Sequence, residues 1–333
     1  MMMQLFSKLF IFISMALRWS LDFPLIREAT VDCGSNVAYT ITVDKNGHGN
    51  FTTVQGAIDS IPSNNNQWVC ISVQAGIYIE QVTIDQDKPC IFLKGVNRSV
   101  TSIEYAAHGQ LNTTPTFSSK ADNFVAKDIS FKNTFNLGSY EEVSPATAVL
   151  VYGDKAAFYS CGFYGLQDTL WDQLGRHYFE QCYVEGSVDF IFGLGYSMYK
   201  DCVISVTPVK NPGFITAQHR NSPNEINGYV FNGGSVVGEG TAYLGRAYGP
   251  YSTVIWYGTS FFKGVVPQGW DNWNRTGQEP NFTYAEVNCS GPGADTSKRV
   301  KWEKKLSDSE LQKFIQPSLS IDSDGWIAKQ PHS

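Results

Sequence analysis

Residues 158–206, FYSCGFYGLQDTLWDQLGRHYFEQCYVEGSVDFIFGLGYSMYKDCVISV, contain one short segment three times. Each copy has an aromatic or apolar pair, one or two further residues, a cysteine and then strand-forming residues, and the cysteines are 21 and 20 residues apart. The copies are FYSCGFYG (158–165), YFEQCYVEG (178–186) and MYKDCVISV (198–206). A β-rich repeat of this length predicts a solenoid in which each repeat forms one coil.

The same pattern recurs without cysteine in FVAKDISFKN (124–133) and YVFNGGSVVG (229–238), and Gly, Asn and Asp separate the copies. Helical periodicity is absent from this region. These features predict an all-β parallel β-helix whose inward side chains stack from coil to coil. An all-β sandwich is the alternative fold, whereas leucine-rich repeats are excluded because the L-x-x-L-x-L pattern is missing.

The cysteines of the repeat should form one inward ladder. We expect Cys161, Cys182 and Cys202 to be buried thiols, or one pair with one spare, and not metal ligands. The chain has seven cysteines, so at least one is unpaired unless two chains are bridged. No Cys or His spacing is typical of a zinc site.

Two helical segments are expected near the ends of the solenoid, which needs capping. Residues 52–62 (TTVQGAIDSIP) have apolar side chains on one helical face and could close the N-terminal end. Ser307 and Glu310 have the spacing of a capping box that begins a helix near the other end. No linker interrupts the chain, so residues 21–333 are expected to form one domain.

The N-terminus resembles a secretory signal of about 20 residues. Lys8 is followed by an apolar stretch that ends near Leu17, which is too short to cross a membrane, and Ala16 and Ser20 are candidate last residues of the signal. Six glycosylation sequons fit secretion, so we expect an extracellular glycoprotein; they are at Asn50, Asn97, Asn112, Asn274, Asn281 and Asn288.

Composition narrows the class of protein. Of 333 residues, 42% are hydrophobic and 17% charged, so the chain can bury a large core and is not wholly disordered. The net charge is −6, without a run of Lys and Arg, which argues against nucleic acid as a partner. No segment after the signal could span a bilayer, so we expect no membrane partner.

The repeat also brings polar residues together. Asp168 in GLQDTL and Asp189 in GSVDFIFG are 21 residues apart, which is one coil. Residues in register on adjacent coils lie about 4.8 Å apart, and two charged carboxylates there would repel by roughly 3 kcal/mol, or about 2 pKa units. If Arg246 pairs with Asp189, that carboxylate stays ionised and can attack, while Asp168 stays protonated and can act as an acid. Gln167 adds an amide donor; the alternative is that both Asp residues lie in exposed turns.

At these residues the sequence resembles plant pectin methylesterases, carbohydrate esterase family 8. Four motifs carry the resemblance, in the family's order, over about residues 40–326. They are Gly76-Ile77-Tyr78-Ile79-Glu80, Gly165-Leu166-Gln167-Asp168-Thr169-Leu170, Asp189-Phe190-Ile191-Phe192-Gly193 and Leu244-Gly245-Arg246-Ala247-Tyr248. The resemblance implies a right-handed parallel β-helix, in a form without the family's inhibitor-like pro-region.

The resemblance also implies an activity, which is hydrolysis of the C6 methyl esters of galacturonate in pectin with release of methanol, without metal or organic cofactor. It implies Asp189 as nucleophile, Asp168 as general acid/base, Gln167 as oxyanion donor and Arg246 as the residue that holds the nucleophile. The substrate-binding aromatics that it implies are Tyr248, Trp270 and Phe190. The implied setting is the plant cell wall, as a monomer, with pectin and proteinaceous pectinesterase inhibitors as partners.

Three departures from the family pattern stand out. The Gln of the family's QAVAL segment, a second oxyanion donor, falls on Pro145, which has no side-chain donor. The Trp of the arginine motif is Tyr248, and Leu194-Gly195 stands where Asn-Ala often follows DFIFG. Loss of an oxyanion donor costs about 10²–10³ in rate. A weakly active or inactive pectin-binding wall protein is therefore the alternative to an active esterase.

Other readings are weaker. A pectate lyase or a polygalacturonase is a third hypothesis, but neither a calcium-site pattern nor the polygalacturonase Asp cluster is visible. His219 in TAQHR is interpreted as a structural or surface residue, and Glu80 as a structural carboxylate at a strand end.

Overall fold

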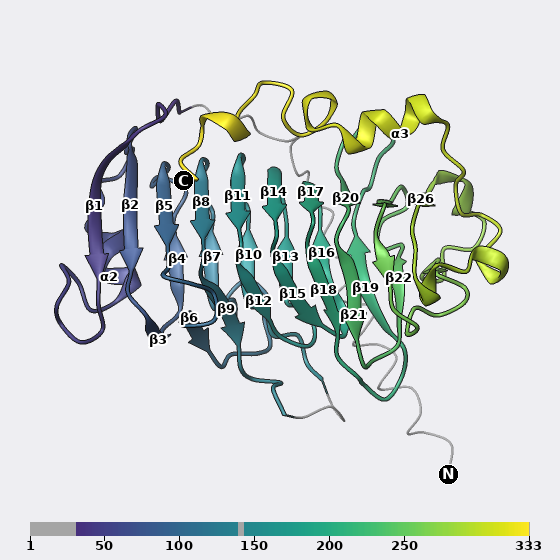
Figure 1. Ribbon diagram of the computed structural model, residues 1–333, viewed down its shortest axis with the longest axis horizontal. Coiled ribbons are helices and arrows are strands. Elements are labelled where there is room, and N and C mark those ends of the chain that lie inside the picture. The colour runs from purple at the N-terminus through teal and green to yellow at the C-terminus, as the bar shows by residue number, and fades with distance from the viewer. Residues whose placement is uncertain (1–30, 139–142, 333) are drawn as a thin grey trace, which may run out of the picture.

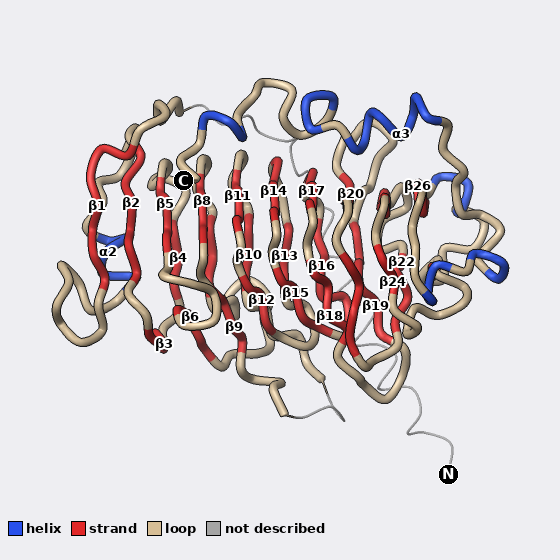
Figure 2. The backbone as a smooth tube through the Cα atoms, viewed as in Figure 1, coloured by secondary structure: helices blue, strands red, loops and turns tan. Residues whose placement is uncertain are grey.

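The computed structural model describes residues 31–138 and 143–332. In this part of the chain, three parallel sheets of ten, eight and eight strands form the sides of a right-handed β-helix, and successive coils stack side by side (Figures 1 and 2). The predicted all-β parallel β-helix is thus confirmed, and the sandwich is excluded. Each coil passes through the sheets in turn, so a residue finds its neighbours about 20–30 residues away, on the coils before and after it.

We name the sheets A, B and C by their strands. Sheet A contains β1 (Val37–Val43), β2 (Trp68–Val73), β5 (Ile91–Lys94), β8 (Phe124–Lys127), β11 (Ala156–Tyr159), β14 (Arg176–Glu180), β17 (Tyr196–Lys200), β20 (Gly228–Asn232), β23 (Thr253–Tyr257) and β26 (Thr283–Val287). Sheet B contains β3 (Gly76–Ile79), β6 (Thr101–Tyr105), β9 (Ser130–Asn133), β12 (Gly162–Tyr164), β15 (Tyr183–Gly186), β18 (Val203–Val206), β21 (Ser235–Gly238) and β24 (Ser260–Phe261). Sheet C contains β4 (Val82–Ile84), β7 (Phe117–Ser119), β10 (Val149–Val151), β13 (Leu170–Asp172), β16 (Val188–Gly193), β19 (Gly213–Gln218), β22 (Ala242–Arg246) and β25 (Trp270–Asp271).

The register of sheet A reproduces the spacing of the repeat. Phe158 pairs with Phe179, and Phe179 with Tyr199, which are steps of 21 and 20 residues. These inward rings stack at centroid distances of 5.0 and 4.5 Å. Phe231 and Trp256 continue the stack on the next coils, at 4.6 and 3.7 Å. Because each coil adds an apolar ring to the same column, the repeat itself builds the core.

The cysteine ladder is buried as expected. Cys161, Cys182 and Cys202 are free thiols with at most 3% exposed surface, and Cys182 and Cys202 donate weakly to carbonyl oxygens of the preceding coil. Burial raises the pKa of Cys161 and Cys202 well above that of an ordinary thiol. The disulfide of this structure lies elsewhere, between Cys33 and Cys90.

The N-terminal end is closed as the sequence predicts. Helix α2 (Val54–Asp59) begins at the N-cap Thr53 and packs its apolar face against β1, β2 and β4. Glu80, from the motif GIYIE, accepts hydrogen bonds from the backbone of Val54 and Gln55 at 2.8 and 3.0 Å. Glu80 therefore has the structural role expected of it, since it satisfies free N–H groups at the start of the helix.

The C-terminal helix forms as predicted but lies on a side of the solenoid. Ser307 and Glu310 make the capping box of α3 (Asp308–Ile315), and Leu311 and Ile315 pack against the outer face of sheet A near β20 (Figure 1). The outer face of sheet A is apolar there, which gives the apolar side of the helix a surface to pack against. The remaining short helices are η1 (Glu279–Asn281), η2 (Pro292–Ala294), η3 (Thr296–Lys298), η4 (Pro317–Leu319) and η5 (Ile327–Lys329).

Strands β1 to β26 form one continuous stack, and no helix in residues 31–138 and 143–332 is long and apolar enough to cross a membrane. The expected signal, residues 1–20, lies outside the described residues.

Candidate active site

The two predicted carboxylates lie on adjacent coils of sheet C. Gln167 pairs in parallel with Val188, so the residues that follow them, Asp168 and Asp189, are neighbours across the coils. The Asp168 backbone N–H donates to Val188 O at 3.0 Å. Asp168 precedes β13 and Asp189 belongs to β16. The structure therefore brings together the pair that the 21-residue spacing predicts, and the alternative of two exposed turns does not apply, because each Asp is only 7% exposed.

Both Asp residues have a left-handed backbone, with φ of 61° at Asp168 and 48° at Asp189. Asp and Asn tolerate this conformation better than other residues with a Cβ. Such backbone conformations cluster at functional sites, because the surrounding structure must hold them.

Arg246, the last residue of β22, binds Asp189 with two hydrogen bonds. Its Nε donates to Asp189 Oδ1 at 2.7 Å, and its Nη2 donates to Oδ2. The guanidinium lies between two rings, 4.1 Å from the centre of Phe214 and 3.4 Å from that of Trp273. Stacking and paired donors suit an arginine at this position and would not suit a lysine. The sequence analysis did not identify Phe214 or Trp273 as parts of this site.

Burial and nearby charges affect the pKa values of the two carboxyl groups differently. Burial raises the pKa of Asp168 well above its usual range, and the neighbouring Asp189 raises it further, against a weaker opposing effect of Arg246. Burial also raises the pKa of Asp189, but the charge and hydrogen bonds of Arg246 oppose that rise. The pKa of Asp168 is thus raised more than that of Asp189, which favours the proton on Asp168.

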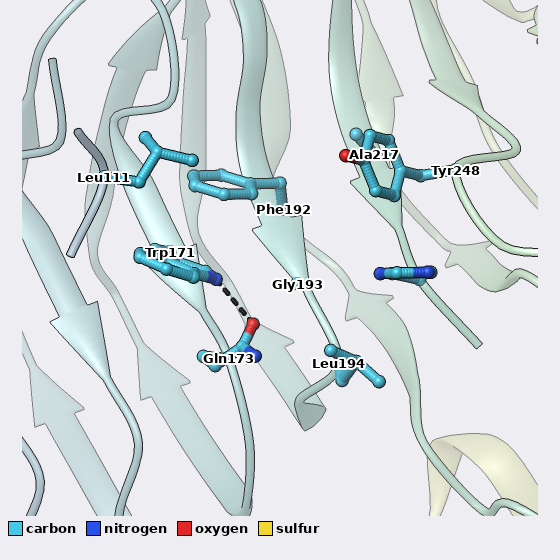
Figure 3. Close-up of a pocket in the computed structure, with 9 residues that line it drawn as sticks. Leu111, Trp171, Gln173, Phe192, Gly193, Leu194, Ala217 and Tyr248 are labelled. Atoms are coloured by element: carbon cyan, nitrogen blue, oxygen red, sulfur yellow. Dashed lines mark hydrogen bonds between the residues drawn. The ribbon is translucent and has the colours of Figure 1, made fainter. Parts of the chain in front are cut away.

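A largely apolar pocket of about 370 Å³ lies on sheet C beside the carboxylates (Figure 3). Trp171 is three residues after Asp168, Phe192 is three residues after Asp189, and Tyr248 is two residues after Arg246. Each of these three sequence segments therefore supplies an aromatic side chain to the pocket. Tyr248 is 42% exposed and meets His219 and Trp273 edge to face. The pocket is lined by Leu111, Trp171, Gln173, Phe192, Gly193, Leu194, Ala217, His219 and Tyr248.

His219 is a pocket residue that the sequence analysis assigned to structure or surface. Its ring lies 4.7 Å from that of Tyr248. Burial lowers its pKa to about 4, and the charge of Arg275 contributes. The imidazole is therefore neutral across mildly acidic and neutral pH.

Two of the three predicted substrate-binding aromatics do not reach the pocket. Trp270 is 1% exposed and stacks on Tyr284 in the core, and Phe190 is fully buried. Neither side chain has surface with which to touch a sugar, so these two assignments are wrong. The aromatic side chains that line the pocket from the same motifs are Phe192 and Tyr248, and Trp273 lies beside them.

Pro145 is a neighbour of Gln167 on the adjacent coil. It pairs in parallel with Gln167 across the preceding coil, so a side chain at position 145 is a direct neighbour of Gln167. The Gln167 amide has no hydrogen-bond partner among residues 31–138 and 143–332. The Gln167 amide is thus available next to Asp168, and Pro145 is its neighbour on the preceding coil.

In the described part of the chain, no group of three or more His, Cys, Asp or Glu residues could hold a metal ion.

Comparison with known proteins identifies the family. A family model described as Pectinesterase matches residues 40–322. Probable pectinesterase 55 of Arabidopsis thaliana is 48% identical over 88% of this chain and 91% of its own length, and Probable pectinesterase 29 of the same plant is 47% identical over 87% and 89%. Pectin methylesterase from carrot superposes with a TM-score of 0.83 at 29% identity, covering 90% of this chain and 98% of its own.

The fungal enzyme also has this fold. Pectin methylesterase from Aspergillus niger superposes with a TM-score of 0.75 at 25% identity, covering 92% of this chain and 99% of its own. The chain therefore belongs to the pectinesterase family, as a plant-type member and a carboxylic ester hydrolase.

Proposed function

We propose that this protein hydrolyses the C6 methyl esters of galacturonate in pectin and releases methanol. The observation that carries the proposal is the charge arrangement of the site: Arg246 binds Asp189 through two hydrogen bonds, and Asp168 lies beside it on the adjacent coil. An ionised carboxylate and a protonated one, side by side, provide a nucleophile and an acid in one site.

The reaction proceeds in two steps. An Asp189 oxygen attacks the ester carbonyl, the Gln167 amide donates to the developing oxyanion, and the Asp168 proton goes to the departing methoxide, so that methanol leaves and an anhydride links Asp189 to the galacturonyl group. Asp168, now ionised, takes a proton from water. The resulting hydroxide cleaves the anhydride, which frees galacturonic acid and restores ionised Asp189 and protonated Asp168. The new acid then releases its proton to solvent as galacturonate.

The pocket supplies binding for the sugar chain. Trp171, Phe192 and Tyr248 present aromatic surface next to the carboxylates, and aromatic faces suit the apolar faces of sugar rings. The methyl-esterified unit is uncharged, which matches a pocket with few charged side chains.

The test is methanol release from highly methylated pectin. Wild type should release methanol, and Asp189→Asn and Asp168→Asn should each lose at least about 10³-fold in rate. Asp201→Asn is the matched control, because Asp201 has the same left-handed backbone (φ 51°) but follows β17 of sheet A, away from the site. Unchanged methanol release by Asp189→Asn would refute the assignment, whereas chain shortening without methanol would indicate a lyase or polygalacturonase.

Pro145 supports a second candidate, a pectin-binding wall protein that turns over slowly. The supporting observation is its direct pairing with Gln167, where a second amide would serve the oxyanion. If the missing donor limits the rate, Pro145→Gln should raise kcat by up to about 10²-fold with little change in pectin binding. Pectin binding without turnover in wild type, together with turnover in Pro145→Gln, favours this candidate; a fast wild type that Pro145→Gln does not improve excludes it.

We also propose that the protein acts outside the cell, in the plant wall. All six sequon asparagines are exposed, and the Cys33–Cys90 disulfide is typical of an oxidising compartment. Enzymatic removal of N-glycans from protein secreted by plant cells should reduce its apparent mass; an unchanged mass and retention inside the cell would contradict secretion and glycosylation.

A further inference from the structure

A buried polar network lies at the far end of β13 from Asp168. The Asp172 carboxylate meets His177 Nδ1 at 2.5 Å through Oδ1, and its Oδ2 accepts a hydrogen bond from Tyr199 at 2.7 Å. The Asp172 carbonyl oxygen accepts another from Tyr229 at 3.1 Å. All four side chains have no exposed surface, so the network does not touch the pocket directly.

His177 has a hydrogen-bond partner at each of its two ring nitrogens. Its Nδ1 faces the carboxylate, and its Nε2 faces the carbonyl oxygen of Gly153 at 3.0 Å. The His177 ring is therefore held on both sides, by the Asp172 carboxylate and by the Gly153 carbonyl oxygen. Removing either member of the Asp172–His177 pair leaves the other side chain buried without its partner, which destabilises the fold.

Glycines make room for Asp172 on the next coil. A Cβ at Gly195 would lie 2.0 Å from Asp172 Oδ1, and one at Gly193 would lie 2.2 Å from the Asp172 carbonyl oxygen. The Gly195 N–H donates to that same oxygen at 2.9 Å. This accounts for Gly195 in place of the expected alanine after DFIFG, because an alanine would collide with the carboxylate. Asp172 thereby joins the end of β13 to the end of β16.

Asp168 lies just before β13, Asp189 lies on β16, and both strands supply residues to the pocket. Asp172 lies between Trp171 and Gln173, whose side chains line the pocket and are hydrogen-bonded to each other (Figure 3). Across the coil, Gly193 and Leu194 line the same pocket. The buried network thus fixes the backbone on both sides of the pocket floor.

We propose that Asp172 and His177 are positioning residues for substrate binding, which act through Trp171, Gln173 and the end of β16. The inference rests on the proposed function, because its readout is turnover of methylated pectin. Removing Asp172 or His177 leaves the other unpaired in the interior and loosens the ends of β13 and β16 that line the pocket. Asp168 and Asp189, near the opposite ends of these strands, remain in place. The expected signature is a raised KM with a kcat close to that of wild type.

The experiment compares single and double variants. His177→Gln and Asp172→Asn should each raise the KM for highly methylated pectin about tenfold while kcat changes less than about threefold. In the double variant the two introduced amides can hydrogen-bond to each other, so its KM should lie below the product of the single effects. Gly195→Ala reaches the same carboxylate from the neighbouring coil and should also raise KM, which keeps the test open if His177→Gln does not fold.

The matched control is Glu286→Gln, which breaks the buried Glu286–Arg299 ion pair on sheet A (side chains 2% and 4% exposed). It should lower the melting temperature as His177→Gln does, with no change in KM. If His177→Gln and Gly195→Ala are both folded and active with the wild-type KM, the network is only structural and the inference is wrong. A wild type that releases no methanol would instead refute the proposed function.

Discussion

Asp168 and Asp189 differ in one contact, which is the basis of the different roles that we propose for them. Both are buried and both have a left-handed backbone. Each directly follows a residue of the Gln167–Val188 pair, so the two occupy equivalent positions on adjacent coils. Arg246 makes two hydrogen bonds to Asp189, whereas it acts on Asp168 only through its charge. Two like groups in like positions therefore acquire different pKa values, as an acid and a nucleophile require.

Arg246 can be tested through the pH profile. Arg246→Gln removes the charge that opposes the effect of burial on Asp189, so the pKa of Asp189 rises and the acidic limb of kcat/KM moves to higher pH. The rate at the optimum should fall by about 10²–10³-fold. Arg246→Lys, which keeps the charge, should shift the limb less. An acidic limb that stays in place in Arg246→Gln would mean that Asp189 is not the group whose ionisation limits the rate.

Asp168 should lower the free energy of unfolding at neutral pH, because its pKa is raised in the folded protein. Its pKa is raised in the folded state, so the folded protein holds a proton that the unfolded chain has already released above about pH 4. The cost is absent below that pH and grows as the pH rises toward the folded pKa. Asp168→Asn should therefore stabilise the protein at pH 7 by on the order of 1–2 kcal/mol, and by less at pH 4. Denaturant unfolding at the two pH values measures this; equal gains, or a loss at pH 7, would contradict the raised pKa.

At the scale of elements, the repeat sets which residues meet. The steps of 21 and 20 residues place Phe158, Phe179 and Tyr199 in one column of sheet A, and the same period places Asp189 beside Asp168. The core and the candidate site are thus two consequences of one coil length.

The aromatic column should carry much of the stability. Phe179 has no exposed surface and stacks between Phe158 and Tyr199. Phe179→Ala should lower the free energy of unfolding by about 3–5 kcal/mol, because it leaves a cavity that flanking coils cannot fill. Ile79→Ala, at a position 71% exposed, should change it by less than about 0.5 kcal/mol. Urea unfolding of both variants measures the difference; similar losses would mean that the column does not support the core.

The repeat length predicts which residues pair between adjacent coils, but it does not predict as well which way each side chain points. The spacing identifies the pairing of Asp168 and Asp189, but it does not tell whether Phe190 or Phe192 points into the pocket, and the resemblance suggested Phe190. The ladder between β16 and β19 has an irregular register between Val188 and Ile191, so simple alternation fails within DFIF. The repeat length also does not predict which of Trp270 and Trp273 faces the core, because the strand that contains Trp270 ends in a turn that contains Trp273.

At the scale of the whole molecule, the C-terminal segment covers the outer face of sheet A, and the pocket lies on sheet C. The segment after β26 runs back along the outer face of sheet A, where Arg176 joins Asp154 to Asp324, at 2.7 and 2.9 Å, and Lys127 contacts the His332 carbonyl oxygen (Figure 1). Sheet C carries the pocket and the carboxylates. The capping-box sequence predicts the helix in this segment, but its docking place depends on the apolar outer face of sheet A, which only the assembled coils create.

The disulfide should stabilise the N-terminal coils. Cys33 and Cys90 close a loop with a sequence separation of 57, for which the loss of chain entropy in the unfolded state predicts about 4 kcal/mol. Replacing both with alanine should lower the free energy of unfolding by about that amount, while Cys289→Ser, at a free cysteine, should have a much smaller effect. Equal stability with and without the disulfide, measured by denaturant unfolding, would show that the N-terminal coils hold without it.

The most direct test of the account is a ¹³C NMR titration of the aspartate carboxyl carbons, with Asp168→Asn and Asp189→Asn to assign the two signals. The account predicts that Asp168 keeps its proton to a higher pH than Asp189, and that Asp189 is ionised while Asp168 is still protonated. The reverse order, or two carboxyls that titrate together at the ordinary pKa of aspartate, would contradict it.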